Sequence, residues 1–220
     1  MTLPSYVGRY RVCSEIARGG FASVVRAWDE ELESLVAIKI LHPNLANDEG
    51  IRTRFLDEAR LLRRIRSPNV VTVHDVGRLN DGRPYFVMDF ADRGTLAERI
   101  RPEAHGKPDP RRLTVLIDAL ADGLAAIHEA GVVHRDIKPA NILFQLARRG
   151  PADTEATLVG DPAGELLLIG ADERILVGDL GIAKDLARHG PLATIVGGTP
   201  LYEAPEQRDG LSEVTPASDI

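Results

Sequence analysis

Cysteine, lysine and long apolar runs are scarce in this chain, and each scarcity excludes a class of protein. Among the 220 residues Cys13 is the single cysteine, which excludes an internal disulfide framework and a cysteine-rich metal site. The longest apolar run, residues 166–171, is far shorter than the roughly 20 residues that cross a bilayer. Residues 1–10 also lack the charged start and apolar centre of a secretory signal. We therefore expect a cytoplasmic location, alone or as the cytoplasmic part of a longer, membrane-anchored protein, with no membrane contact within residues 1–220.

Positive charge is limited and comes mostly from arginine. The 27 basic residues include four lysines, and the net charge is -6. A chain without a basic excess is a poor match for a nucleic-acid-binding protein, so no nucleic-acid partner is expected. Apolar residues at 44% and charged residues at 27% are the proportions of an ordinary soluble domain, and the length predicts one to two compact units.

The spacing of apolar residues changes along the chain and predicts two regions. Short β-branched runs between glycine and charged turns predict strands from residue 10 to 40, and helical spacing predicts a helix over 49–66. Asp81-Gly82 is expected to turn a further hairpin, and the apolar residues of 113–127 share one helical face. The pattern predicts an α+β fold: an extension (1–9), a strand-rich unit (10–90) and a helix-led unit (91–220).

Residues 145–174 interrupt the second unit. The segment is rich in glycine, proline and acidic side chains, which predicts a surface insertion. It is expected to hold at most one hairpin, Leu166–Ile169 with Ile175–Val177, and it can loop out only if the strand ends near Leu143 and Val177 stay paired.

The segment His134-Arg135-Asp136-Ile137-Lys138-Pro139-Ala140-Asn141 concentrates chemically useful side chains. The carboxylate of Asp136 can orient a hydroxyl group and accept its proton. The ammonium group of Lys138 can balance the charge of a phosphate, and the amide oxygen of Asn141 suits a hard cation such as Mg²⁺. Side chains with these three capabilities thus lie within one short segment.

This segment resembles the catalytic loop of eukaryotic-like serine/threonine protein kinases of the bacterial type, and the resemblance extends from about Tyr10 to Ile220. It implies a bilobal fold, with a β-rich N-lobe over 10–90 and a helical, incomplete C-lobe over 91–220. It also implies that Asp136 is the catalytic base, that Lys138 contacts the transferred phosphate and that Asn141 holds one Mg²⁺. Lys138 at this position is typical of serine/threonine rather than tyrosine kinases.

Three further segments resemble parts of the same family. Val36-Ala37-Ile38-Lys39 is similar to its third strand, which implies that Lys39 binds the α- and β-phosphates of ATP and pairs with Glu58 on the next helix. Residues 177–181 take the place of the family's metal-binding Asp-Phe-Gly motif, which implies that Asp179 holds Mg²⁺. Leu180 stands where phenylalanine is usual. Residues 198–206 resemble the segment that receives a protein substrate, which favours proteins over small molecules as phosphate acceptors.

The nucleotide pocket departs most from the family pattern. Residues 16–24 resemble the glycine-rich loop, but Ala17 and Ala22 stand where glycines are usual, which predicts a stiffer loop and weaker ATP binding. The resemblance implies that adenine lies between the loop and Leu143, with its edge against the backbone of Asp89 and Ala91. The residues expected to bind ATP are Ile16, Ala17, Arg18, Gly19, Gly20, Phe21, Ala22, Ser23, Val24, Ala37, Lys39, Glu58, Met88, Asp89, Ala91 and Leu143.

Regulation and partners are implied by the same resemblance. Thr194 is the candidate phosphorylation site, because a phosphate there could pair with Arg135 and order its loop. We expect protein substrates with serine or threonine hydroxyls, and self-association during autophosphorylation. The alternative is a pseudokinase, a nucleotide-binding scaffold or sensor without turnover, which the altered loop and the long separation of Asn141 from Asp179 favour.

The last residues, Ser218-Asp219-Ile220, resemble the start of the helix that anchors the C-lobe of this family. There Asp219 would support the backbone of the catalytic loop. Because the helices that should follow are absent, we expect residues 1–220 on their own to be poorly stable and inactive.

Overall fold

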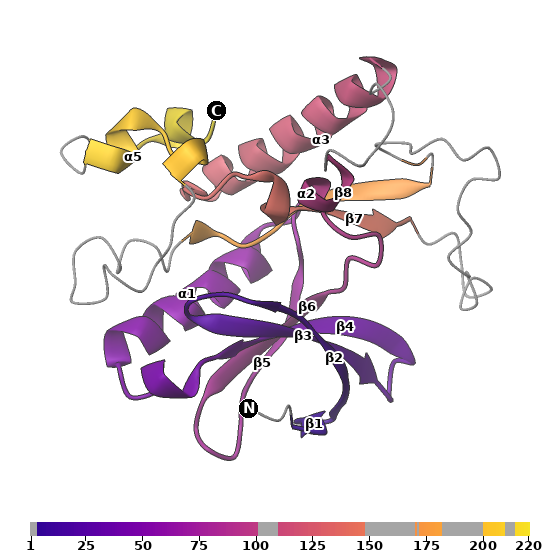
Figure 1. The fold of residues 1–220 in the computed structure, drawn as a ribbon, viewed down its shortest axis with the longest axis vertical. Helices are drawn as coiled ribbons and strands as arrows, with labels where there is room; N and C mark the ends of the chain where they lie inside the picture. The colour runs from indigo at the N-terminus through magenta and orange to yellow at the C-terminus, as the bar shows by residue number, and fades with distance from the viewer. Residues whose placement is uncertain (1–3, 101–109, 148–169, 171, 182–199, 210–213) are drawn as a thin grey trace.

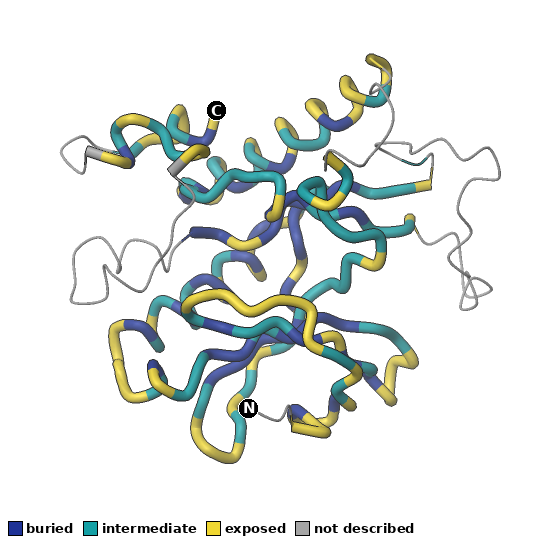
Figure 2. The backbone as a smooth tube through the Cα atoms, in the orientation of Figure 1, coloured by how far each residue is buried: buried dark blue, intermediate teal, exposed yellow. Residues whose placement is uncertain are grey.

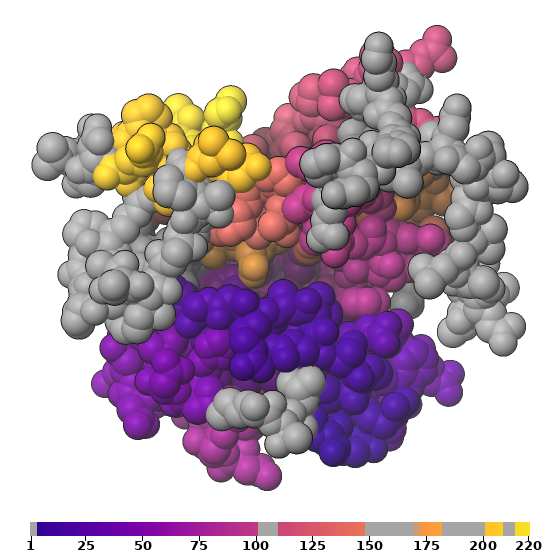
Figure 3. Space-filling model, viewed as in Figure 1, coloured from indigo at the N-terminus to yellow at the C-terminus, as the bar shows by residue number. Residues whose placement is uncertain are grey.

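The computed structural model describes residues 4–100, 110–147, 170, 172–181, 200–209 and 214–220. These residues form two stacked bodies, a lower one that ends with β6 and an upper one built from the rest of the chain (Figure 1, Figure 3). Thr194, Leu166–Ile169 and Gly198-Thr199 lie outside the described residues.

The lower body is an antiparallel sheet with one long helix beside it. In the order in which they neighbour one another, its six strands are β1 (Tyr6–Val7), β2 (Tyr10–Arg18), β3 (Ala22–Asp29), β4 (Ser34–Leu41), β6 (Pro84–Asp89) and β5 (Val73–Arg78). A short 3₁₀ turn, η1 (Pro43–Leu45), precedes the helix α1 (Glu49–Arg64). This helix begins after Asp48, whose carboxylate accepts a hydrogen bond from Ile51 N. The strand-rich unit with one helix is thus present.

Alternation along the strands gives the sheet two apolar faces. Phe86 points toward α1, where its ring centroid lies 5.1 Å from that of Phe55. Val36 and Val87 belong to a second buried cluster on the opposite, outer face. Because Lys39 alternates with its buried neighbours Ile38 and Ile40, it points to the α1 face. In Figure 2 much of β2 is exposed, whereas β4 is largely buried.

In its described residues, the upper body is helical apart from one hairpin. Its elements are α2 (Leu96–Arg99), α3 (Pro110–Glu129), η2 (Pro139–Asn141), β7 (Ile142–Leu146), β8 (Glu173–Val177), η4 (Pro200–Tyr202), α5 (Pro205–Asp209) and η5 (Pro216–Asp219). Helix α3 packs against β8, and a Cβ on Gly123 would lie 2.8 Å from Asn69 O, so only glycine fits at this approach. Within the described ranges, no helix has both the length and the apolar character to span a membrane.

The strand after the insertion pairs differently from the prediction. Ile175–Val177 were expected to pair with Leu166–Ile169, but β8 pairs with β7, with Ile142 opposite Val177. The other edge of β8 is occupied as well, because Val177 N donates to Asn69 O and Val71 N donates to Val177 O. The strand ends near Leu143 and Val177 are therefore paired, as looping out of the insertion requires, whereas Leu166–Ile169 lie outside the described residues.

Candidate active site

Lys39, Glu58 and Asp179 meet where the two bodies face each other. Lys39 comes from β4, Glu58 from α1, and Asp179 follows β8. Lys39 Nζ lies 2.7 Å from Glu58 Oε1 and 2.8 Å from Asp179 Oδ1. The Lys39–Glu58 pair expected from the sequence is present, and the same ammonium group reaches a carboxylate of the upper body.

Burial and charge oppose each other in this cluster. Burial alone would lower the pKa of Lys39, but Asp179 and Glu58 outweigh it and raise that pKa, so Lys39 stays charged. Burial raises the pKa of Glu58 to about 7, against the attraction of Lys39. Lys39 in turn holds the pKa of Asp179 below its usual value. At neutral pH Lys39 and Asp179 are therefore ionised, while Glu58 titrates in this range.

Residues 134–141 hold their polar side chains together through short internal bonds. Lys138 Nζ lies 2.9 Å from Asp136 Oδ2. Asn141 Nδ2 donates to Asp136 O at 2.8 Å, and Gly178 N donates to Asn141 O at 3.0 Å. The structure thus brings Asp136, Lys138 and Asn141 together and places Asn141 against the residue that precedes Asp179.

Asp219 supports the backbone of this loop. Its carboxylate accepts hydrogen bonds from His134 N and Arg135 N, both at 2.7 Å, and lies 2.8 Å from His128 Nε2. Arg135 has a left-handed backbone with φ +65°, which is costly for a residue with a side chain. The two hydrogen bonds to Asp219 offset that cost, because they fix the amide groups on either side of His134 and so hold the backbone that leads into Arg135.

His134 joins the catalytic loop to the segment that carries Asp179. Its Nδ1 accepts a hydrogen bond from Asp136 N at 3.2 Å, so Nε2 carries the proton and donates to Gly178 O at 2.9 Å. Burial lowers the pKa of His134 and keeps the ring neutral, as this pair of bonds requires. Gly181 N donates to His134 O, and a Cβ on Gly181 would come within 2.9 Å of that oxygen. Only glycine allows the segment to approach the loop so closely.

The donors at this point fit a small divalent cation. Asp179 offers a carboxylate, and Asn141 offers the amide oxygen that remains after its nitrogen binds Asp136 O. Two protein oxygens, with the other ligands taken from water and phosphate, are typical of Mg²⁺ at phosphate-transfer sites. Among the described residues no group of three or more histidine, cysteine or acidic side chains could enclose a metal ion alone.

The hairpin of β2 and β3 carries the residues of the predicted glycine-rich loop. Gly19 N donates to Ala22 O at 2.9 Å and closes the turn, while Phe21 packs on the main core. Val24 lies opposite both Ala17 and Lys39 in the sheet, so these side chains share one face.

Two residues of this loop direct their side chains elsewhere. Ser23 Oγ lies 3.0 Å from His42 Nε2 on the outer face, and Arg18, opposite Ser23 in the ladder, forms an ion pair with Glu15. Ile16 is half exposed where the β2 register shifts. Arg18 and Ser23 can therefore serve a nucleotide on the Lys39 face through their backbone only.

The connection from β6 to α2 lines the remaining side of the site. Ala37 lies opposite Met88 in the sheet, and residues 89–94, which we call the hinge, follow directly. Arg93 N donates to Phe144 O at 3.0 Å and Phe144 N donates to Gly94 O at 2.9 Å, so the hinge is bonded to β7. Leu143 on β7 packs beside Gly178, which places it next to the Asp179 segment.

Residues 200–209 attach to the catalytic loop. The buried Gln207 donates from Nε2 to Arg135 O at 3.1 Å and accepts a hydrogen bond from Ala204 N at 3.0 Å. Glu206 accepts a hydrogen bond from the hydroxyl of Ser218. The described part of the segment expected to receive a substrate therefore lies against the loop that carries Asp136.

Sequence reasoning gave no role to three residues that hold the site in place. His128 binds Asp219, His74 lies 2.9 Å from Asp89 Oδ1, and Gln207 binds Arg135 O. Neither histidine has the spacing of a metal ligand, and each finds a carboxylate far away in the sequence. For Gln207 a signal existed, because it directly follows the segment that ends at Glu206.

Comparisons with known proteins agree with this geometry. A family model described as protein kinase domain matches residues 10–220. Over 215 residues the chain is 34% identical to serine/threonine-protein kinase PknL of Mycobacterium tuberculosis, a match that covers 96% of this chain and 46% of PknL. It is 34% identical over 217 residues to serine/threonine-protein kinase pkn2 of Myxococcus xanthus, covering 97% of this chain and 23% of pkn2. The chain therefore spans less than half the length of these relatives.

The fold is shared with a solved structure. The crystal structure of the Mycobacterium tuberculosis PknI kinase domain superposes with a TM-score of 0.66 at 23% identity, covering 99% of this chain and 73% of the PknI chain. Both bodies of the present structure thus have counterparts in a kinase domain, which confirms the predicted bilobal α+β fold. Together with the match over residues 10–220, this shows that the chain belongs to the protein kinase domain family.

Proposed function

We propose that the protein containing this chain transfers the γ-phosphate of ATP to serine or threonine hydroxyls of proteins. The observation that carries the proposal is the convergence of distant residues. Lys39 and Asp179, 140 positions apart, lie 2.8 Å from each other, and Asn141 ties Asp136 to the Asp179 segment. The serine/threonine kinase names of the relatives support the acceptor class.

The catalytic loop acts on the hydroxyl group that accepts the phosphate. Asp136 orients the incoming hydroxyl and takes up its proton. Lys138, 2.9 Å from that carboxylate, balances the charge of the transferred phosphoryl group. Residues 200–209 lie beside the loop and would hold the substrate segment that carries the hydroxyl.

The lower body and the Asp179 segment bind the nucleotide. Lys39 binds the α- and β-phosphates, and Glu58 keeps its ammonium group in position. Asn141 and Asp179 would hold Mg²⁺, which supplies positive charge to the phosphates when it is bound. The adenine would lie against Val24, Ala37 and Leu143, with its edge on the backbone of the hinge; the other apolar and backbone contacts would come from Ile16, Ala17, Gly19, Gly20, Phe21, Ala22, Met88, Asp89 and Ala91.

A second copy of the protein is among the proposed substrates. Thr194 would accept a phosphate from a partner copy during self-association, and that phosphate would pair with arginines such as Arg135. Thr194→Ala is expected to abolish phosphate incorporation at this position and to lower activity. Full activity of this variant, with no phosphate on Thr194 of the parent by mass spectrometry, would remove this part of the proposal.

Transfer of labelled phosphate from ATP with Mg²⁺ by the full-length protein tests the proposed function. Asp136→Asn and Lys39→Met should each lower transfer by at least about 10²-fold, since each removes a group that acts on the transition state. Asp118→Asn, on the exposed side of α3, is the matched control and should leave transfer unchanged. A parent that binds ATP but transfers no phosphate would instead be a pseudokinase.

A further inference from the structure

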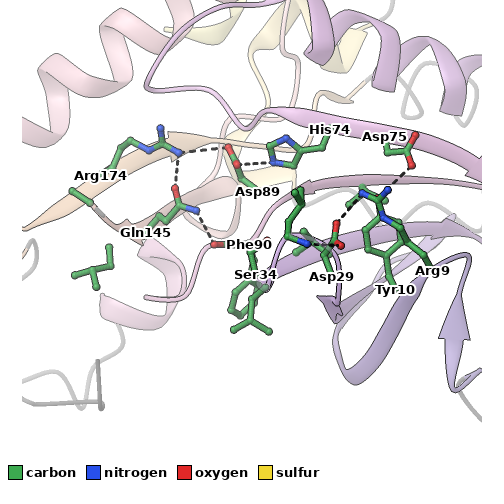
Figure 4. A pocket seen from close by; sticks show the side chains of 16 residues that line it. Arg9, Tyr10, Asp29, Ser34, His74, Asp75, Asp89, Phe90, Gln145 and Arg174 are labelled. Carbon is green, nitrogen blue, oxygen red and sulfur yellow. Dashed lines mark hydrogen bonds and ion pairs between the residues drawn. The ribbon is translucent and has the colours of Figure 1, made fainter. Parts of the chain in front are cut away.

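A hydrogen-bonded network of side chains holds the hinge (Figure 4). We define the hinge network as His74, Asp89, Phe90, Gln145 and Arg174. The carboxylate of Asp89 lies 2.9 Å from His74 Nε2 and 3.5 Å from Arg174 Nη2. Arg174 Nη2 also donates to Gln145 Oε1 at 2.5 Å, and Gln145 Nε2 donates to Phe90 O at 2.9 Å.

The network lies on the opposite side of the sheet from the candidate nucleotide site. All five of its residues line a cavity of about 810 Å³ on the outer face, together with Val36 and Val87. Ala37 and Met88, the neighbours of these two valines, point to the other face. Asp89 thus has its side chain in the network, while its backbone forms the start of the hinge.

The network also joins the two bodies. Gln145 on β7 and Arg174 on β8 lie directly opposite each other in the hairpin that bounds the insertion. Burial works against ionisation of Asp89, but hydrogen bonds from His74 and Thr72 N hold its pKa below the usual value. A charged, largely buried carboxylate on the lower body is therefore paired with an arginine from the upper body.

We propose that Gln145 and Arg174 are positioning residues for the nucleotide, because they fix the hinge backbone that meets the adenine edge. This inference rests on the proposed function. Adenine presents an N6 donor where guanine presents an O6 acceptor, so a fixed backbone carbonyl and amide select between the two bases. Releasing Phe90 O and Asp89 from the hairpin lets these groups move, which weakens binding and selection of the base without touching the groups that transfer phosphate.

The test compares Arg174→Ala and Gln145→Glu with the parent in the full-length protein. Gln145→Glu keeps an acceptor for Arg174 but loses the donor to Phe90 O. Arg11→Ala, which removes an exposed ion pair 3.6 Å long with Glu30, is the matched control. The measurements are the Kd for ATP and GTP by titration of the protein, kcat and KM for ATP, and the unfolding temperature.

We expect both network variants to raise the Kd for ATP about five- to tenfold, the effect of losing one hydrogen bond, and to lower the preference for ATP over GTP by a similar factor. The kcat should change less than about twofold, and the control should match the parent in every measurement. An unchanged Kd and base preference in Gln145→Glu overturns the inference, even if Arg174→Ala fails to fold. A lower unfolding temperature with unaltered preference shows a structural role only and overturns it too. If the parent itself does not bind ATP, the proposed function fails, and this inference with it.

Discussion

Lys39 shares its charge between two carboxylates that come from different bodies of the molecule. Taking these groups out of water is costly, and the cost is recovered only while all three are in contact. An ATP phosphate can take the place of Asp179 at the ammonium group, whereas Glu58 is held on α1 and is almost fully buried. The residue that sets the position of Lys39 is therefore Glu58.

The pKa of Glu58 predicts how activity depends on pH. Because burial raises this pKa to about 7, the Lys39–Glu58 ion pair weakens as the pH falls through neutrality. We expect kcat/KM for ATP to fall on the acid side with an apparent pKa near that value, and Glu58→Gln to lose this acid limb. A parent profile that stays flat through neutral pH would contradict the assignment.

Glu58 has the opposite effect on stability. Its pKa is higher in the folded chain than in the unfolded chain, so protonation favours folding. This contribution is fully present below the ordinary pKa of a glutamate and is lost as the pH rises to about 7. The pH-dependent difference in unfolding free energy between the parent and Glu58→Gln measures it. If the parent instead gained unfolding free energy relative to Glu58→Gln as the pH rises, this would contradict a raised pKa of Glu58.

Position 181 requires glycine because a side chain there would collide with the catalytic loop, not because the backbone needs the flexibility of glycine. A Cβ there would lie 2.9 Å from His134 O and 3.0 Å from the Cβ of Asp136, so Gly181→Ala must push the Asp179 segment off the loop. We expect a loss of about 1–3 kcal/mol in unfolding free energy and a loss of transfer activity. At Gly19 an added Cβ would lie 3.6 Å from its nearest neighbour, Ala22 O, which is an ordinary contact distance. Thermal unfolding of both variants should therefore show little change in unfolding free energy for Gly19→Ala.

At the scale of elements, the hairpin of β7 and β8 is the frame that brings the metal-binding candidates together across the insertion. Its ladder runs from Ile142 and Val177 to Leu146 and Glu173, and Ala147 N donates to Asp172 O at 2.7 Å beyond it. Replacing residues 148–169 by Asn-Gly should therefore leave Mg²⁺-dependent ATP binding within about twofold of the parent. Loss of binding in a variant that still melts cooperatively would show that the insertion contributes to the site.

An ion pair fastens this hairpin to α2. Arg99 Nη1 and Nη2 each lie 2.7 Å from an oxygen of Glu173, and the guanidinium group stacks 3.6 Å above the ring of Phe144. Burial works against ionisation of Glu173, but Arg99 and Gly170 N hold its pKa below the usual value.

Removing one partner of this pair leaves a buried charge uncompensated. Arg99→Met should cost about 3 kcal/mol in the unfolding free energy, measured by denaturant titration of the full-length protein. Adding Glu173→Gln to Arg99→Met should recover part of that loss. A single variant that loses less than about 1 kcal/mol would show that the pair is effectively solvated.

At the scale of the whole molecule, local patterns predicted the strand-rich unit, α1 and α3, whereas the contact of Lys39 with Glu58 was implied by the resemblance to the kinase family. These features depend on periodicity and on motifs whose residues are close together in the sequence. For β8 the sequence pattern indicated the nearest apolar run, residues 166–169, as hairpin partner, whereas the partners in the described residues, β7 and residues 69–71, are not its neighbours in sequence. Pairing of strands across a long connection is decided by tertiary packing, which a single sequence does not display.

The resemblance implied that Asp219 supports the catalytic loop, but the other supporting contacts could not be predicted, for the same reason. His128 and Asp219 are 91 positions apart, and the hinge network joins β5, β6, β7 and β8. No spacing rule links such residues, although each is ordinary chemistry once the fold has placed it. Val115 and Ile117 of α3 are exposed as well, and helical periodicity alone does not indicate a packing partner for them.

The proposed phosphate transfer depends most on Asp179 and Asn141, which would join a metal ion to the phosphates that Lys39 binds. Calorimetric titration of the full-length protein with ATP, with and without Mg²⁺, in the parent and in Asp179→Asn, tests this directly. We predict that Mg²⁺ strengthens ATP binding by the parent and that Asp179→Asn loses this effect while it remains folded. A parent that does not bind ATP, or an Asp179→Asn variant with the full Mg²⁺ effect, would contradict the account.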